Sequence, residues 1–307
     1  MNEQKDGWLE RSVLSVPGSN WHMIEKAVTT AADLAFIDLE DAVAPNAKVE
    51  SRQHVIKAFH SLDWGEKPRA YRINALDTPF FYRDIIDIVE QSGDALDVLI
   101  VPKVGRPEDL YVVDTLLTQI EVAMGLTPGK IKLEAQIENA VGLVNVERIA
   151  MVTSRLEALV FGHGDYAASM RMPTVSIGAM DWWDERYPGH RFHYAMSRTV
   201  VAARAAGIRA IDSPLADYKD LDAYRKMCII ARGLGYDGKW CIHPSQIAIA
   251  NEVFSPTEQE LQWAREVVTA YQQAMARGTG AISMGDRMID MASLRMAQMI
   301  LKVTEGK

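Results

Sequence analysis

The chain has 307 residues, of which 48% are hydrophobic and 24% charged, with a net charge of −8. This is the balance of a globular protein with a large core, and the acidic excess argues against a general nucleic-acid-binding surface, which needs a basic face. Two cysteines predict no disulfide framework and favour the cytoplasm. The first residues predict no secretory signal, and no apolar run approaches the ~18 residues of a membrane span.

Eight short apolar runs recur before residue 245 and predict β-strands. They are rich in Val, Ile, Leu and Ala and show little polar alternation, which is typical of strands buried on both faces of a parallel sheet. They lie at 11–18, 34–41, 69–74, 98–104, 132–139, 158–165, 208–214 and 239–244.

The segments between these runs predict helices. One begins at Ser19 or Asn20, and another follows the Thr-Pro pair at 78–79 and ends at Gly93. Eight strands alternating with helices predict an α/β fold, a (β/α)8 TIM barrel, with a doubly wound sheet as the alternative.

The barrel is expected to occupy residues 1–250, followed by a C-terminal helical extension over 251–307. This tail predicts a helix over about 256–276, a glycine-rich turn, and a short segment leading into another helix. About fifty residues are too few for an independent core. The tail should therefore pack on the barrel or on a neighbouring subunit.

Polar residues close seven of the eight predicted strands at the same end. In a (β/α)8 barrel the carboxyl ends of the strands form the mouth that holds the active site. These residues are Asp38, Glu40 and Asp41, then Arg72 and Asn74, Lys103, Glu138 and Asn139, His163 and Asp165, Asp212, and His243.

Several carboxylates in one mouth repel one another unless a cation offsets them. Glu138 and Asp165 end consecutive strands, and oxygen ligands without cysteine favour Mg²⁺, with Mn²⁺ as the alternative ion. The competing interpretation is that both are solvated loop acids or helix caps. Asp38 is expected in a structural hydrogen-bond network, whereas Glu40 and Asp41 could hold metal-bound water.

Arg72 is the natural electrophile, because a guanidinium stays charged while it faces a carbonyl or enolate oxygen. A salt bridge to one of the acids is compatible with that role. Lys103 could form a Schiff base, but the sequence around it disfavours this. His163 and His243 are predicted to be hydrogen-bonded histidines at strand ends rather than acid/base groups.

A long loop after the sixth strand carries Trp182, Trp183, Tyr187 and Phe192. These aromatic side chains are predicted to pack the loop rather than to stack on a nucleotide. A role as a lid over the mouth stays open.

An ordered set of motifs resembles the citrate lyase β-subunit-like (HpcH/HpaI aldolase) family, and within it the malyl-CoA lyase branch. The motifs are VPGSN, DLEDAVAP, RIN with LDTPFFYRD, PKVG, IEN, FGHGDYAAS, GKWCIHPSQI and MIDMAS. Each motif is weak alone, but the ordered set is specific and spans about residues 11–301.

This resemblance implies an Mg²⁺-dependent, reversible aldol-type (Claisen) cleavage of a 3-hydroxyacyl-CoA. Malyl-CoA would give acetyl-CoA and glyoxylate, and β-methylmalyl-CoA would give propionyl-CoA and glyoxylate. It implies Glu138 and Asp165 as metal ligands, Arg72 on the enolate oxygen, and Asp290 of the MID motif as acid/base.

The resemblance further implies a homotrimer or homohexamer in which the tail reaches over the active site of an adjacent subunit. From the residues alone, Asp290 reads as a helix N-cap. Lys26 and His22, after VPGSN, are candidates for the CoA phosphates, although His22 stands where the family is expected to carry Arg. His163 is a second departure and could tune which acyl-CoA fits.

Three other functions stay open. A citramalyl-CoA lyase would release pyruvate, and a malyl-CoA thioesterase would release malate and CoA, both from the same kind of site. A non-catalytic binding protein on the same barrel is the remote alternative, and the complete set of Arg72, Glu138, Asp165 and Asp290 argues against it.

Overall fold

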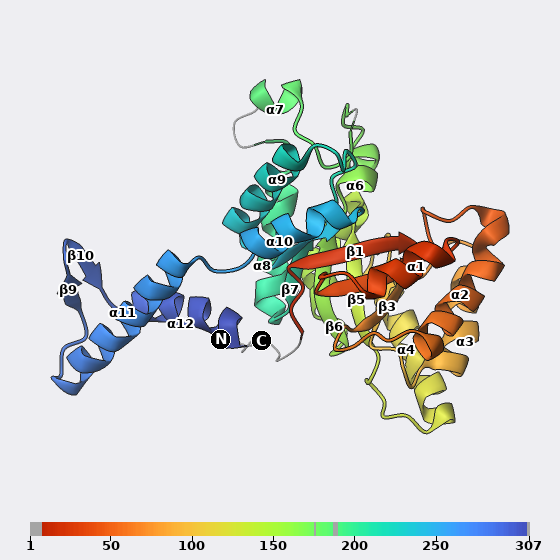
Figure 1. Ribbon diagram of the computed structural model, residues 1–307, viewed down its shortest axis with the longest axis horizontal. Helices are drawn as coiled ribbons and strands as arrows, with labels where there is room; N and C mark the ends of the chain where they lie inside the picture. Colours follow the sequence, from red (N-terminus) through yellow and green to blue (C-terminus); the bar gives the residue numbers. More distant parts are fainter. Residues whose placement is uncertain (1–7, 175, 187–189, 306–307) are drawn as a thin grey trace. The chain divides into compact units, whose positions relative to one another are not determined.

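The computed structural model describes residues 8–174, 176–186 and 190–305. The chain forms two compact units. One is built around residues 10–252, and the other around residues 253–305 with Trp8 and Leu9. Figure 1 shows the helices and strands of both. Among the described residues, no helix is both long and apolar enough to cross a membrane.

Eight parallel strands of the first unit close into a barrel in chain order, because β1 pairs with both β2 and β8. This confirms the predicted (β/α)8 fold. The strands are β1 (Ser12–Pro17), β2 (Leu34–Asp38), β3 (Arg69–Arg72), β4 (Val98–Val101), β5 (Lys132–Ile137), β6 (Leu156–Phe161), β7 (Arg209–Asp212) and β8 (Gly238–Cys241).

Helices follow the strands and cover the barrel (Figure 1). Asn20 caps α1 through its side chain, and α4, α8 and α9 end at Gly125, Gly207 and Gly235, whose positive φ suits glycine. The helices are α1 (Trp21–Val28), α2 (Lys48–Ser61), α3 (Phe81–Ser92), α4 (Pro107–Met124), α5 (Ala140–Ala150), α6 (His163–Ser169), α7 (Trp182–Arg186), α8 (His193–Ala206), α9 (Leu221–Leu234) and α10 (Ile247–Val253), with short 3₁₀ turns η1 (Pro45–Ala47) and η2 (Pro244–Gln246).

All eight predicted strands run past the observed carboxyl ends, by one to four residues. β2 stops at Asp38 and β6 at Phe161, so Glu40 and Asp41 lie in a turn and His163 and Asp165 in the first turn of α6. The polar residues after Asp38 and Phe161 therefore follow the carboxyl ends of their strands, in a turn and in the first turn of α6, at the end of the barrel where functional groups are found.

The second unit consists of α11 (Glu258–Ala276), a hairpin of β9 (Ile282–Met284) and β10 (Arg287–Ile289), and α12 (Met291–Glu305). A capping box of Thr257 and Glu260 starts α11. The two helices pack around a small core, which includes Val267, Tyr271 and Ala297. The predicted helices are present, and the short segment between them is a β-hairpin.

A buried acidic cluster lies at the amino-terminal ends of the strands, opposite the mouth. Glu10, Glu134 and Glu157 are buried there with Arg209, whose Nη2 lies 3.2 Å from Glu10 Oε1. Burial raises the pKa of Glu134 well above its ordinary value, and the neighbouring Glu10 carboxylate adds to the effect. Arg209 opposes this shift only in part, so the folded protein binds the Glu134 proton more tightly than the unfolded chain does.

Replacing Glu134 with glutamine should stabilise the protein increasingly as the pH rises. The folded state holds a proton that the unfolded chain releases above about pH 4.3, so the stability that Glu134 contributes is full below that pH and is lost as the pH rises. Urea unfolding at pH 5 and pH 7 should show E134Q gaining roughly 1 kcal/mol per pH unit over the wild type. The exposed Glu90→Gln variant is the control, and parallel curves for E134Q and wild type would contradict the prediction.

Candidate active site

The turn after β2 is held from both sides. The Asp38 carboxylate accepts the N–H groups of Glu40 (2.9 Å) and Ala42 (3.2 Å). From the other side, the buried ammonium of Lys48 donates to the carbonyls of Leu39 and Glu40, each at 2.6 Å. Each end of the turn's dipoles therefore meets an opposite charge, which fixes the direction in which the Glu40 side chain leaves the backbone.

Arg72 at the end of β3 is buried and bound in a fixed orientation. Its Nε and Nη2 donate to the two oxygens of Asp38, both at 2.7 Å, and Nη1 donates to Gln136 Oε1 at 3.1 Å. The guanidinium carbon lies 5.4 Å from the Trp240 ring centroid and 5.9 Å from that of Phe36. A guanidinium has five N–H donors, so these contacts leave at least one for a ligand oxygen.

Glu40 joins Arg72 to Lys103. Its Oε2 lies 2.9 Å from Arg72 Nη1, and its Oε1 lies 2.8 Å from Lys103 Nζ. Burial raises the pKa of Glu40, and the charges of Arg72 and Lys103 oppose that shift. Glu40 therefore forms ion pairs with two cations, the buried Arg72 and the partly exposed Lys103.

Glu138, one residue past β5, is 3% exposed. Its Oε1 accepts the backbone N–H of Lys103 at 2.8 Å and its Oε2 accepts Gln136 Nε2 at 2.7 Å. A Cβ at Gly162 would lie 2.5 Å from Glu138 Oε2, so only glycine fits there. Burial raises the pKa of Glu138 to about 8; Arg72 opposes the shift, and the charges of Glu40 and Asp165 add to it.

Asp165 and Asp41 complete the group at the mouth. Their side chains are 42% and 61% exposed, and their oxygens lie 3.7 Å and 3.4 Å from Lys103 Nζ. The mouth thus gathers five carboxylates around two cations. The carboxylates belong to Asp38, Glu40, Asp41, Glu138 and Asp165, and the cations to Arg72 and Lys103.

This donor set fits a divalent ion bound by oxygen. The acidic side chains at the mouth outnumber the cations, and burial, with a smaller contribution from the charges of Glu40 and Asp165, raises the pKa of Glu138. Within the described residues, no three His, Cys, Asp or Glu side chains converge as a complete metal site. Mg²⁺ suits such a set, because it commonly takes one or two carboxylates and completes its shell with water and substrate oxygens.

Comparison with known proteins decides the family. A protein-family model described as HpcH/HpaI aldolase/citrate lyase matches residues 11–244. The chain belongs to this family. An L-malyl-CoA/beta-methylmalyl-CoA lyase of Cereibacter sphaeroides is 42% identical over 301 residues, covering 96% of this chain and 94% of the relative. A citrate lyase subunit beta of Leuconostoc mesenteroides subsp. cremoris is 34% identical, covering 100% of this chain and 96% of the relative.

Solved structures agree with the fold of this aldolase/citrate lyase family. CitE from Mycobacterium tuberculosis, in complex with magnesium, acetoacetate and coenzyme A, is 25% identical with a TM-score of 0.77, covering 97% of this chain and 98% of that one. A citrate lyase from Burkholderia xenovorans is 20% identical with a TM-score of 0.80, covering 97% and 92%, and supports the barrel fold alone.

Two polar strand-end residues of this family member do not face the mouth. His163 and Asp212 are fully buried, and Asp212 Oδ2 binds the Lys239 ammonium at 2.5 Å beside the Tyr224 ring of α9. His163 Nδ1 contacts Ser213 Oγ at 2.6 Å. Burial lowers the pKa of His163 to about 4, so it is neutral. The prediction of a hydrogen-bonded His163 is confirmed, and its influence on the choice of acyl-CoA stays a prediction.

The remaining strand-end residues have local structural partners. Asn139 caps α5 and donates to the carbonyl of Lys103 at 3.2 Å. Asn74 is tied to the buried Asp84 by two hydrogen bonds. His243 caps η2 through Ser245 and stacks on Tyr218, with ring centroids 4.8 Å apart. The prediction of a hydrogen-bonded His243 is confirmed.

The predicted CoA contacts lie on α1, which follows β1. His22 has a side chain 71% exposed and lies 3.9 Å from Glu25, and Lys26 is exposed in the last turn of the helix. Lys26 lies in the last turn of α1, where its positive charge interacts favourably with the helix dipole, and so it is remote from the N-terminus of the helix. Both side chains are exposed to solvent.

Asp290 belongs to the second unit. Its Oδ1 accepts the N–H groups of Ala292 and Ser293, both at 3.0 Å, and the Ser293 hydroxyl at 3.2 Å. These hydrogen bonds lower the pKa of Asp290. The N-cap expected from the sequence is present, and its acid/base role rests on the resemblance.

The aromatic loop after β6 divides into a buried and an exposed part. Phe192 is buried and packs against His163, whereas Trp182 and Trp183 are 55% and 39% exposed with ring centroids 3.8 Å apart. Tyr187 lies outside the described residues. Packing is confirmed for Phe192, whereas the two tryptophans contact each other and are partly exposed, so the prediction for them stays a prediction.

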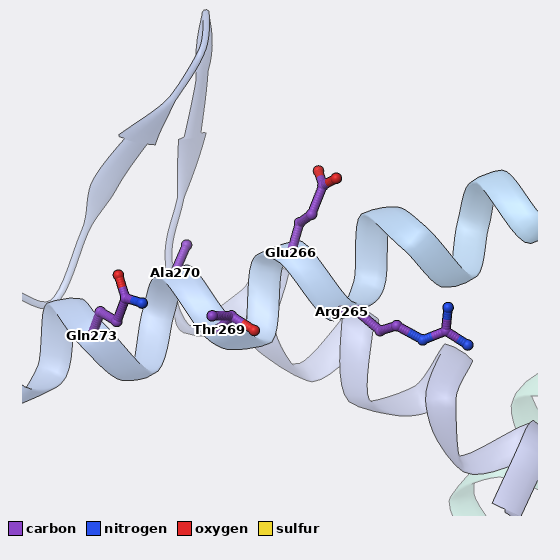
Figure 2. Close-up of a pocket in the computed structure, with 5 residues that line it drawn as sticks. All are labelled: Arg265, Glu266, Thr269, Ala270 and Gln273. Atoms are coloured by element: carbon purple, nitrogen blue, oxygen red, sulfur yellow. The ribbon is translucent and has the colours of Figure 1, made fainter.

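A hollow of about 340 Å³ lies along α11 in the second unit. Figure 2 shows its lining residues, Arg265, Glu266, Thr269, Ala270 and Gln273. All five come from one face of the helix, and Arg265 is paired with Glu258 at 3.4 Å. With no convergent set of catalytic groups, this hollow does not compete with the barrel mouth as the active site.

Three contributors to the site escaped the sequence analysis: Lys48, Gln136 and Gly162. Lys48 lies ten residues after Asp38, on a helix, and Gln136 lies inside a strand. The glycine in FGHGD was visible as a motif, but the carboxylate that it accommodates was not. Their roles depend on distances between elements, which spacing along the chain does not encode.

Proposed function

We propose that this protein is an Mg²⁺-dependent lyase that cleaves a 3-hydroxyacyl-CoA, with malyl-CoA as the main substrate. Its products are acetyl-CoA and glyoxylate, and β-methylmalyl-CoA would give propionyl-CoA and glyoxylate. The observation that carries the proposal is the arrangement at the mouth, where Arg72 in a fixed orientation lies beside the carboxyl groups of Glu40 and Glu138. The 42% identity to malyl-CoA lyases over 96% of the chain supports this choice of substrate.

The proposed ligands of the ion are Glu138 and Asp165, with Mn²⁺ as the alternative to Mg²⁺. When bound, the ion acts as a Lewis acid toward the oxygens of the oxo acid. Gln136 and the Lys103 backbone N–H hold Glu138 in place. Glu40 and Asp41 are proposed to orient water beside the ion, since both lie at Lys103 next to Asp165.

Arg72 is proposed to stabilise the enolate of the acyl-CoA, and Asp290 to transfer the proton at the enolate carbon. Cleavage begins when a base takes the proton of the 3-hydroxyl group; the carbon–carbon bond then breaks, and the electron pair forms the enolate of the acyl-CoA. The Arg72 guanidinium, kept charged by Asp38, stabilises the enolate oxygen. In the condensation direction the Asp290 carboxylate takes a proton from the carbon next to the thioester carbonyl, and in the cleavage direction the protonated Asp290 returns it to the enolate carbon.

The proposal extends to CoA binding and assembly. His22 and Lys26 are the candidates for CoA phosphates. The second unit exposes methionines on β10 and α12, namely Met288, Met291, Met296 and Met299, which supports burial against another copy in a homotrimer or homohexamer. The free, buried thiols of Cys228 and Cys241 are compatible with a cytoplasmic protein.

The deciding assay is metal-dependent glyoxylate release from malyl-CoA. Glyoxylate should form with Mg²⁺, stop with EDTA and resume when Mg²⁺ is added in excess. Free CoA with malate and no glyoxylate would mean a thioesterase, and pyruvate from citramalyl-CoA alone would mean the other lyase. If none of these esters is turned over but acyl-CoA binds tightly, the result would support a non-catalytic binding protein.

A further inference from the structure

Lys103 contacts both proposed metal ligands. Its backbone N–H donates to Glu138 Oε1 at 2.8 Å, and its Nζ lies 3.7 Å from Asp165 Oδ2. The backbone has a φ of 55°, in the left-handed region that non-glycine residues rarely adopt. Strain of this kind costs free energy and is found at functional sites, where the surrounding structure maintains it.

The Lys103 ammonium lies among three carboxylates at the mouth. It is 2.8 Å from Glu40 Oε1 and 3.4 Å from Asp41 Oδ1, as well as 3.7 Å from Asp165. The side chain is 37% exposed, so it can move, in contrast to the buried Arg72 that Asp38 holds with two hydrogen bonds. The carboxylates that would attract a divalent ion therefore already share a cation.

We propose that Lys103 is a built-in competitor of the metal ion, which weakens ion binding in the free protein and couples it to binding of the oxo-acid anion. This inference rests on the proposed function, because it takes Glu138 and Asp165 as the ligands. The positive charge of Lys103 beside Asp165 repels a divalent ion. The carboxylate of the oxo acid neutralises that charge, so ion and anion strengthen each other's binding by the same factor.

The size of the effect follows from Coulomb's law. An ammonium and a divalent ion about 5 Å apart in a solvated mouth repel each other enough to change the dissociation constant about tenfold. Removing the ammonium should therefore tighten Mg²⁺ binding, even though the same change deprives Glu40 of a partner. A residue that merely supported the fold would give the opposite sign.

The test is calorimetric titration of Mg²⁺ into the full chain. Lys103→Met and Lys103→Gln should bind Mg²⁺ about tenfold more tightly than the wild type at low salt. Lys103→Arg, which keeps the charge, should match the wild type. Lys67→Met is the control for net charge, because Lys67 lies in the loop before β3, at the opposite end of the barrel. The difference should shrink at high salt, where the charges are screened.

A second titration series adds saturating glyoxylate. Glyoxylate should tighten Mg²⁺ binding in the wild type by a larger factor than in either neutral variant. Neutral variants that bind Mg²⁺ no more tightly than the wild type would overturn the inference and leave the proposed function standing. A wild type that binds no Mg²⁺, with or without glyoxylate, would overturn the metal site and the inference together.

Discussion

Arg72→Lys should lower kcat for glyoxylate release from malyl-CoA by about 10²–10³, the usual cost of losing one donor to a developing oxyanion. The substitution keeps the positive charge beside Asp38 but removes the planar fork, whose Nε and Nη2 bind that carboxylate while Nη1 reaches Gln136. The enolate oxygen then loses a donor at a fixed position. The measurement is steady-state kinetics with malyl-CoA, in which kcat should fall more than KM rises.

The matched control is Arg155→Lys. Arg155 is also a buried arginine, 3% exposed and paired with Glu121 at 2.6 Å, but it precedes β6 at the amino-terminal end of the barrel. Both substitutions disturb a buried ion pair and should lower the urea midpoint. Only R72K should lower kcat, and equal losses of kcat in the two variants would show that Arg72 acts through stability alone.

The position of the mouth could be predicted from the sequence because strand ends are easy to recognise. A polar residue that closes an apolar run lies at the carboxyl end of its strand, and in a parallel barrel all such ends meet. Arg72, Lys103, Glu40 and Glu138 lie together as that argument requires. The argument needs only chain order and polarity, both of which are explicit in the sequence.

The same argument fails for Asp212 because side chains alternate between the two faces of a strand. Trp240 of β8 packs near Arg72, so its neighbour Lys239 points the other way and meets Asp212 beside α9. A strand of four residues gives too short a pattern to decide which face is inside. A polar residue at a strand end therefore predicts at which end of the barrel the residue lies, but not whether its side chain points into the barrel or toward the helices.

The hairpin before α12 was missed for a related reason. Its two strands, Ile-Ser-Met and Arg-Met-Ile, have three residues each, which is too short for an alternating pattern. The available signal was the turn: Gly285 and Asp286 connect Met284 to its partner Arg287, and Gly285 has a φ of 60°. A two-residue connection that starts with glycine is typical of a hairpin.

Replacing Glu138 with glutamine should abolish both Mg²⁺ binding and lyase activity. Glutamine keeps the shape and the contact with the Lys103 N–H, but it removes the negative charge that burial and the neighbouring acids already make costly. One of two proposed anionic ligands is lost, so the dissociation constant for Mg²⁺ should rise at least about a hundredfold. Calorimetry measures this loss without relying on turnover.

Glu134→Gln is the matched control for that variant, because it makes the same substitution four residues earlier, within β5 and toward the other end of the barrel. E134Q should bind Mg²⁺ and cleave malyl-CoA like the wild type, since Glu134 lies among Glu10, Glu157 and Arg209 and not at the mouth. Normal Mg²⁺ affinity in E138Q would contradict Glu138 as a ligand and would assign the ion to Asp165, Asp41 and Glu40. Lost affinity in E138Q with normal affinity in E134Q would leave the end of β5 as the place where the barrel binds its ion.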